Sequence, residues 1–250
     1  MEHGRIDNGA GVELAWQRLP GEGPTVVFLP GYRSDMTGDK AQAIAALCQR
    51  QAKGLLLFDY AGHGASGGRF EDGTIGHWTQ DALAAIDSLT QGPLVLVGSS
   101  MGGWIGLLVA LVRPERIAGF LGVAAAPDFT ETLMWESMTF EERTTLMQNG
   151  VLHVPSPYGE PLPITRALIE DGRSRLLLNG PIPLTCPVRL LQGLEDTDVP
   201  WETALRLSER LEAADVQVVL VKDGTHRLSR PQDLALLERT LLPLLGQNGA

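Results

Sequence analysis

A serine flanked by glycines, at a point where a strand gives way to a helix, constrains this chain more than any other feature. The pentapeptide GSSMG at 98–102 follows the apolar run 93–97 and precedes the helix-like run 103–112. So tight a turn leaves room only for glycine two positions before and two positions after its central residue. It also holds the central side chain in a strained, exposed position above the sheet. The pattern therefore predicts a buried strand followed at once by a helix, with Ser100 as an attacking oxygen.

The rest of the chain alternates short β-type runs with amphipathic helical runs, a pattern typical of a mostly parallel sheet with helices on both faces. The predicted core strands are 26–29, 55–59, 94–97, 119–123, 188–192 and 216–221, with an antiparallel edge strand at 12–19. The predicted helices are 39–51, 78–89, 103–112, 201–211 and 231–245. We expect residues 1–250 to form a single α/β domain.

One stretch, 127–183, breaks this alternation and is rich in proline between positions 155 and 163. An insertion of this length without core strands is more typical of a functional lid than of a passive loop. Met134, Trp135 and Met138 would give it an adaptable apolar surface, and we predict that they bind substrate. The alternative is that they dock the insertion onto the main domain, and both can hold together.

Composition restricts the partners of the chain. A net charge of −10 argues against nucleic acid or an anionic membrane as the main partner. The longest apolar run, 105–112, is too short for stable membrane insertion. The first residues carry acids and no apolar leader segment, from which we expect a cytoplasmic protein. Cys48 and Cys186 are predicted to be buried free thiols, and without CxxC or HExxH patterns we expect no metal and no cofactor.

A serine hydroxyl needs a base to take its proton and a third group to orient that base. Of the five histidines, His226 follows the predicted strand 216–221 and comes after Ser100 in chain order, so we predict that it is the base. His3 is expected in a loose terminus, and His63 lies in a glycine-rich loop.

The orienting acid is expected at the carboxyl end of the predicted strand 188–192, where open α/β sheets place their sites. Glu195, Asp196 and Asp198 share the loop that follows. We favour Asp196, because the Val-Pro exit that follows leaves Asp198 as a helix-capping or solvated acid. Asp198 stays the second candidate and Glu195 the third.

Attack on an acyl carbon creates an oxyanion, which backbone N–H groups must receive. Met101 supplies one N–H, because it follows Ser100 at the start of a helix. We predict that the second comes from Tyr32, in the Pro-Gly-Tyr loop after the strand 26–29, with Gly31 allowing a close approach. An ordinary Pro-Gly turn is the alternative reading of that loop.

A second glycine pattern, GHGASG at 62–67, matches the GxGxxG fingerprint of dinucleotide-binding sites and follows a predicted strand. That fingerprint should open directly into a helix, whereas Gly68, Gly73 and Gly76 prolong the loop. We therefore predict a tight loop at the floor of the site. The side chains of His63 and Ser66 are expected to form hydrogen bonds with the backbone of this same loop.

Together these residues resemble the α/β-hydrolase superfamily. The similarity spans roughly 14–245 and rests on PGY at 30–32, FDY at 58–60, VGSSMGGW at 97–104 and the segment 181–201. It implies the α/β-hydrolase fold, a mostly parallel sheet flanked by helices with a lid insertion, and it places the catalytic residues at Ser100, Asp196 and His226. It also implies hydrolysis of S-acyl-cysteine or activated acyl esters, the activity of an acyl-protein thioesterase or depalmitoylase.

We therefore expect a cofactor-free serine hydrolase that cleaves acyl thioesters or activated carboxylic esters through an acyl-enzyme. Its substrate would be a small-molecule ester or thioester, or an S-acylated protein. One alternative is a general carboxylesterase acting on small-molecule esters. A second, from a different class, is a non-catalytic ligand-binding protein on the same fold, because fold does not determine function.

Overall fold

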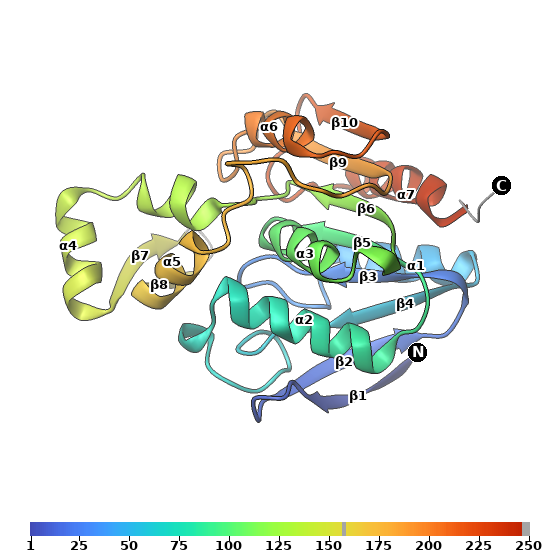
Figure 1. The fold of residues 1–250 in the computed structure, drawn as a ribbon, viewed down its shortest axis with the longest axis horizontal. Helices are drawn as coiled ribbons and strands as arrows, with labels where there is room; N and C mark the ends of the chain where they lie inside the picture. The colour runs from blue at the N-terminus through green and yellow to red at the C-terminus, as the bar shows by residue number, and fades with distance from the viewer. Residues whose placement is uncertain (157–158, 247–250) are drawn as a thin grey trace.

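The computed structural model describes residues 1–156 and 159–246, and its centre is an eight-stranded sheet (Figure 1). The strand order is β1-β2-β4-β3-β5-β6-β9-β10. The first two strands pair antiparallel, β2 pairs antiparallel with β4, and all later neighbours are parallel. The strands are β1 (Glu2–Asp7), β2 (Glu13–Leu19), β3 (Glu22–Leu29), β4 (Lys53–Phe58), β5 (Leu94–Ser99), β6 (Ile117–Val123), β9 (Val188–Gly193) and β10 (Val216–Val221). The predicted fold class is confirmed.

Helices cover both faces of the sheet and enclose two apolar cores (Figure 1). One core holds α2 (Ile75–Leu89), α3 (Met101–Val112) and α6 (Glu202–Arg210), and the other holds α1 (Asp39–Arg50) and α7 (Pro231–Gly246). Successive side chains of β3 alternate between them: Val27 and Leu29 pack into the first, Val26 and Phe28 into the second. Burial on both faces explains why the inner parallel strands β3, β4, β5, β6 and β9 are largely apolar.

Two differences from the sequence prediction concern the N-terminus and the start of α2. His3 lies in β1, paired opposite Gln17 of β2, so the expectation of a loose N-terminus is wrong. The charged residues of β1 give no apolar run by which the strand could be predicted. An edge strand can carry such residues because only one of its faces is covered. Helix α2 begins at Ile75, not at 78, because the Thr74 hydroxyl accepts the His77 N–H and caps its first turn with Gly76 inside it.

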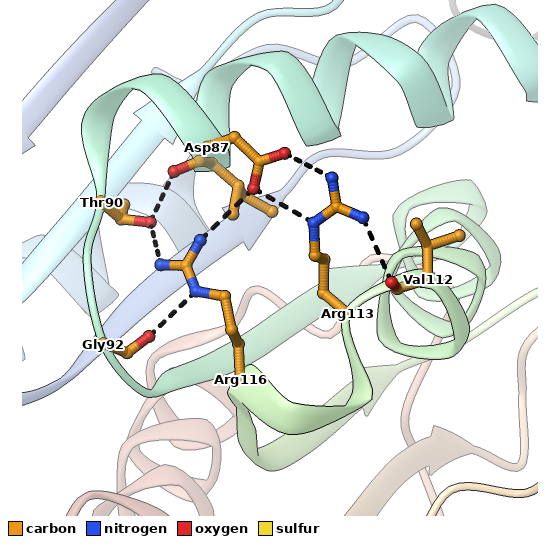
Figure 2. A network of polar contacts seen from close by, with 7 residues as sticks. Asp87, Thr90, Gly92, Val112, Arg113 and Arg116 are labelled. Carbon is orange, nitrogen blue, oxygen red and sulfur yellow. Dashed lines mark hydrogen bonds and ion pairs between the residues drawn. The ribbon is translucent and has the colours of Figure 1, made fainter.

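A polar network joins the end of α2 to the connection between α3 and β6 (Figure 2). The Arg113 guanidinium donates to Asp87 at 2.7 Å, and Arg116 also reaches this carboxylate at 3.4 Å. Arg116 further donates to the Thr90 hydroxyl at 2.9 Å and to the Gly92 carbonyl at 3.1 Å. These contacts lie at the amino end of β5, opposite to the end at which Ser100 follows the strand.

Residues 127–183, the predicted lid, contain their own helices and a hairpin that stands apart from the main sheet (Figure 1). These are the π-helical turn η3 (Thr130–Trp135), α4 (Phe140–Asn149), β7 (Val151–Ser156), β8 (Gly159–Thr165) and α5 (Arg166–Arg173). Met138, Leu146, Ile164 and Ile169 form a small core inside this segment. Among the described residues, no helix is long and apolar enough to cross a membrane.

Candidate active site

The pentapeptide at 98–102 forms the sharp turn between β5 and α3. Ser100 has φ +53° and ψ −119°, a backbone conformation that is strained for a residue with a side chain. Its N–H donates to the Val123 carbonyl of β6 at 3.0 Å, which ties the turn to the neighbouring strand. A side chain at Gly102 would collide with the Leu29 carbonyl of β3, and one at Gly98 with the Gly102 carbonyl. The two glycines are therefore required by close backbone approach.

The predicted base and acid reach Ser100 from two other strand ends. His226, in the loop after β10, has Nε2 3.1 Å from the Ser100 Oγ. The other ring nitrogen, Nδ1, lies 2.9 Å from Oδ2 of Asp196 in the loop after β9. A backbone bond joins the two loops, because the Glu195 N–H donates to the Gly224 carbonyl at 2.9 Å. The structure thus brings together the three predicted side chains, while their catalytic roles stay a prediction.

Asp196 is surrounded by donors, and its side chain has no exposed surface. Burial by itself would raise the pKa of this carboxyl, but hydrogen bonds from His226 and from the N–H groups of Val199 and Asp198 hold the pKa below its usual value. The Gln192 side-chain amide also donates to Oδ2, at 2.8 Å. Asp196 is therefore held ionised, in the state that can accept the Nδ1–H of His226.

The loop that carries His226 is also held by residues other than Ser100 and Asp196. Lys40 of α1 donates from Nζ to the carbonyl of Arg227, the residue after His226, at 2.5 Å. Burial, with the nearby Arg227 charge, lowers the pKa of Lys40 to about 8. Arg230, four residues after His226, forms ion pairs at 2.8 Å with Asp223 and with Asp233. These contacts limit the movement of the imidazole.

The loop after β3 lies against the serine. A Cβ placed on Gly31 would be 3.4 Å from the Ser100 Cβ, so the loop that contains Tyr32 lies beside Ser100. The Tyr32 ring packs edge-on against Phe70, with centroids 4.9 Å apart, and its hydroxyl donates to the Pro163 carbonyl of β8 at 3.2 Å. Met101 is fully buried at the start of α3, where the first helical N–H groups have no partner within the helix. The two predicted oxyanion donors thus flank Ser100 on neighbouring segments.

A cavity of about 750 Å³ opens onto Ser100 and His226. Its lining includes the apolar residues Phe129, Leu133, Met134 and Leu162 of the insertion, together with charged and hydroxyl residues of the loops around α1 and His226. Of the three predicted substrate-binding residues, only Met134 lines this cavity. Trp135 packs 4.3 Å from the Arg173 guanidinium, and Met138 lies in the core of the insertion.

Three residues support these groups in ways that were not predicted from the sequence: Gln192, Lys40 and His63. Gln192 could have been identified from the sequence, because a polar residue near the end of an apolar buried strand needs a hydrogen-bond partner. His63 was assigned to its own loop, and its Nδ1 does lie 3.2 Å from the Ala61 carbonyl. Its Nε2, however, accepts the N–H of Arg33, thirty residues away in sequence, at 3.2 Å.

Two further groups of residues near this site resemble a metal site and a dinucleotide-binding loop. Asp196, Asp198 and His226 bring three possible ligand atoms within 4.8 Å of one another, but the Asp196 and His226 atoms are already engaged in the hydrogen bonds described above. The loop at 62–67 leads into the 3₁₀ turn η1 (Phe70–Asp72) rather than directly into α2, unlike a dinucleotide fingerprint. The Ser66 hydroxyl accepts the Ala15 N–H of β2 and donates to the carbonyl of Asp59, the residue after β4, so the prediction that it bonds the backbone of its own loop is wrong.

A sharp strand-to-helix turn at β5, with an acid after β9 and a histidine after β10, defines the class of α/β hydrolases. The profile of the alpha/beta hydrolase family matches residues 26–236, and the chain belongs to that family. The predicted resemblance is confirmed, and membership supports a hydrolase.

Among named relatives, the palmitoyl-protein thioesterase ABHD10, mitochondrial, of Pongo abelii is 40% identical over 234 residues, covering 93% of this chain and 76% of the relative. The Homo sapiens protein of the same name is 39% identical over the same shares. The solved structure of alpha/beta hydrolase domain-containing protein 10 from mouse has a TM-score of 0.92 at 35% identity, covering 100% of both chains. A crystal structure from Agrobacterium vitis S4 has a TM-score of 0.94 at 42% identity, covering 98% of both chains.

These names correct one prediction. The relatives from Pongo abelii, Bos taurus and Homo sapiens are all named as mitochondrial, which contradicts the expectation of a cytoplasmic protein. That expectation came from the lack of a leader-like pattern in the first residues, and the absence of a pattern does not identify a compartment.

Proposed function

We propose that this chain is a serine hydrolase that cleaves acyl thioesters through an acyl-enzyme on Ser100. One observation carries the proposal: the unbroken chain of contacts from Ser100 Oγ to His226 Nε2 at 3.1 Å, and from His226 Nδ1 to Asp196 at 2.9 Å. A serine used only for packing has no need of a base, or of a buried carboxylate behind that base.

The proposed reaction has two halves. His226 takes the proton of Ser100 as its oxygen attacks the acyl carbon, and Asp196 stabilises the imidazolium that results. The N–H groups of Tyr32 and Met101 receive the oxyanion. As the bond from the acyl carbon to the sulfur breaks, the imidazolium returns the proton to the departing thiolate. His226 then deprotonates a water, which attacks the acyl-enzyme and releases the carboxylic acid, and Ser100 regains its proton.

Two observations support an acyl thioester as the substrate. The relatives that share about 39% identity over most of the chain are named palmitoyl-protein thioesterases. The cavity before Ser100 is lined by apolar residues of the insertion, which suit an acyl chain, and by polar and charged residues, which suit a hydrated leaving group. The substrate class of this chain is therefore proposed to be long- or medium-chain S-acyl groups on a small thiol or on a protein cysteine.

The test is the hydrolysis of acyl thioesters of increasing chain length, measured as the release of free thiol. Ser100→Ala is expected to lose turnover and labelling by a fluorophosphonate probe, while Ser99→Ala, at the neighbouring serine, keeps both. Retained turnover in Ser100→Ala would refute the proposal.

The same assay separates the alternatives. A general carboxylesterase would hydrolyse short oxygen esters faster than the matched thioesters, with no rise in rate at medium or long chains. A ligand-binding protein would bind acyl compounds and leave all of them intact.

A further inference from the structure

We propose that His63 is a positioning residue that holds the oxyanion loop, residues 30–33, in the conformation that presents the Tyr32 N–H. This inference rests on the proposed function, because it takes Tyr32 as an oxyanion donor. The contact that carries it is the 3.2 Å hydrogen bond from the Arg33 N–H to His63 Nε2.

The oxyanion loop contains a turn that its sequence does not favour. The Ser34 N–H donates to the Gly31 carbonyl at 3.0 Å, which closes a β-turn with Tyr32 and Arg33 at its two central positions. Arg33, the second of these, has φ +57°. A positive φ there is typical of the type II turn, in which glycine usually occupies this position. A residue with a side chain is strained in this left-handed conformation, because its Cβ comes too close to the following carbonyl oxygen.

His63 opposes the relaxation of this turn. A type I turn would relieve the strain at Arg33 by rotating the peptide between Tyr32 and Arg33 through about a half turn. That rotation would aim the Arg33 N–H away from His63 and change the backbone angle at Tyr32, next to the N–H that faces the site. The hydrogen bond to His63 Nε2 exists only in the observed arrangement, so it favours that turn over the relaxed one.

The imidazole is held in the tautomer that this bond requires. Its Nδ1 lies 3.2 Å from the Ala61 carbonyl, which also accepts the Trp78 indole N–H at 3.1 Å. A carbonyl oxygen can only accept, so the proton lies on Nδ1, and Nε2 presents a lone pair to the Arg33 N–H, which can only donate. The local chemistry thus assigns both ring nitrogens of His63.

The surroundings keep this ring neutral and immobile. His63 is 4% exposed and packs against Phe70 and Trp78, with ring centroids 5.1 Å away in each case. The Tyr32 ring contacts the same two aromatic residues. Burial lowers the pKa of His63 to about 4, so its Nε2 is an acceptor across the neutral range. One aromatic cluster therefore anchors both the side chain of Tyr32 and the histidine that fixes the next backbone N–H.

Substitutions at His63 separate hydrogen bonding from packing. His63→Phe keeps an aromatic ring but removes the acceptor, and it is expected to lower kcat on the order of 10- to 100-fold with KM changed less than about threefold. His63→Gln can place its carbonyl oxygen near the former Nε2, and should recover kcat to within about fivefold of the native enzyme. His63→Asn reaches only the Ala61 side, and should be as slow as His63→Phe. His3→Phe, on β1, is the matched control with native kcat.

A double variant tests the turn itself. Glycine adopts a positive φ without strain, so Arg33→Gly should restore most of the kcat lost in His63→Phe, by comparison with Arg33→Gly alone. A role of His63 in packing alone would give no such recovery. Because this cycle compares rates, it decides the question even where His63→Phe lowers the unfolding temperature.

Inhibitor affinity reports on the oxyanion directly. An acyl trifluoromethyl ketone, which forms an oxyanion on Ser100, should bind His63→Phe more weakly by the same factor as kcat/KM falls, while a thioether analogue without a carbonyl binds equally to both. Unchanged kcat in His63→Phe, or no recovery in the double variant, would overturn the role of His63. If the His63 variants give either of these results while Ser100→Ala loses activity in the same assay, the role of His63 is refuted but the proposed function is not.

Discussion

Replacing Asp196 by Asn should nearly abolish catalysis while leaving the fold largely intact. The carboxylate accepts four donors: His226 and Gln192 at Oδ2, and the N–H groups of Asp198 and Val199 at Oδ1. An asparagine can keep its oxygen toward the two backbone N–H groups, and then its NH₂ faces the other two. His226 can meet that NH₂ only by moving its own proton from Nδ1 to Nε2.

That tautomer has no lone pair toward the Ser100 Oγ, so it cannot act as a base. We therefore expect kcat to fall about 10⁴-fold. A loss of this size is typical where the acid of a serine–histidine–acid triad is replaced by its amide and the imidazole takes the wrong tautomer. The effect on stability is smaller, because one hydrogen bond between side chains is lost and the others are re-formed. We expect the free energy of unfolding to fall by about 1–2 kcal/mol at pH 7.

The pH dependence of this stability difference has a definite sign. The pKa of Asp196 is lower in the folded state than in the unfolded chain, where it is about 3.9. Its charge therefore stabilises the fold above pH 4, and this contribution is lost as the pH falls through the folded-state pKa. Denaturant unfolding of the native protein and Asp196→Asn should converge as the pH is lowered below 4.

Thiol release from an acyl thioester at pH 7 measures kcat, and circular dichroism under denaturant measures stability. Glu195→Gln, in the same loop but exposed, is the matched control and should retain native kcat. Asp198→Asn should lose less than about fivefold, because the bond from Asp198 to Asp196 is donated by its backbone N–H, which the substitution keeps. A loss below tenfold in a folded Asp196→Asn, or a 10³-fold loss in Asp198→Asn, would refute the assignment of the acid.

Three further predictions concern stability. Gly102→Ala puts a methyl group against the Leu29 carbonyl, and should lower the free energy of unfolding by about 3 kcal/mol together with kcat; an unchanged denaturation midpoint contradicts this. The pKa of Lys40 is about 8 in the folded state and about 10.4 in the unfolded chain. Between these two pH values the unfolded state binds more protons than the folded state, so the free energy of unfolding should rise with pH. That rise, up to about 3 kcal/mol, should be absent from unfolding curves of Lys40→Met, and its persistence there would show that another group causes it. Asp87→Ala breaks the contacts with two arginines shown in Figure 2, and should cost about 1 kcal/mol while kcat stays unchanged, since the network lies at the far end of the sheet; a change in kcat would be the contrary result.

The parts of the fold that could be predicted from the sequence are those with a local signal. The six apolar strand runs correspond to β3, β4, β5, β6, β9 and β10. In the five inner strands of this set, residues buried on both faces of the sheet must be largely apolar, whereas β10 is a partly exposed edge strand that is still rich in valine. Strand β1 escaped prediction, because an edge strand needs no such run. The hairpin β7 and β8 escaped because prolines at 155, 161 and 163 argue against a central strand, whereas a two-stranded hairpin tolerates them at its edges.

The same distinction applies to the site. Ser100, Asp196 and His226 each follow a strand, and the carboxyl ends of parallel strands meet at one edge, so chain order alone places the three side chains near one another. The groups that support them have no such rule. Gln192 is four residues from Asp196 and could be inferred from its polarity in a buried strand, but the contact between His63 and Arg33 joins two loops whose relative position depends on the packing of Tyr32, Phe70 and Trp78. The residues proposed to act on the substrate can therefore be inferred from their spacing in the sequence, whereas a residue proposed to act through the backbone of another loop can be identified only from the three-dimensional structure.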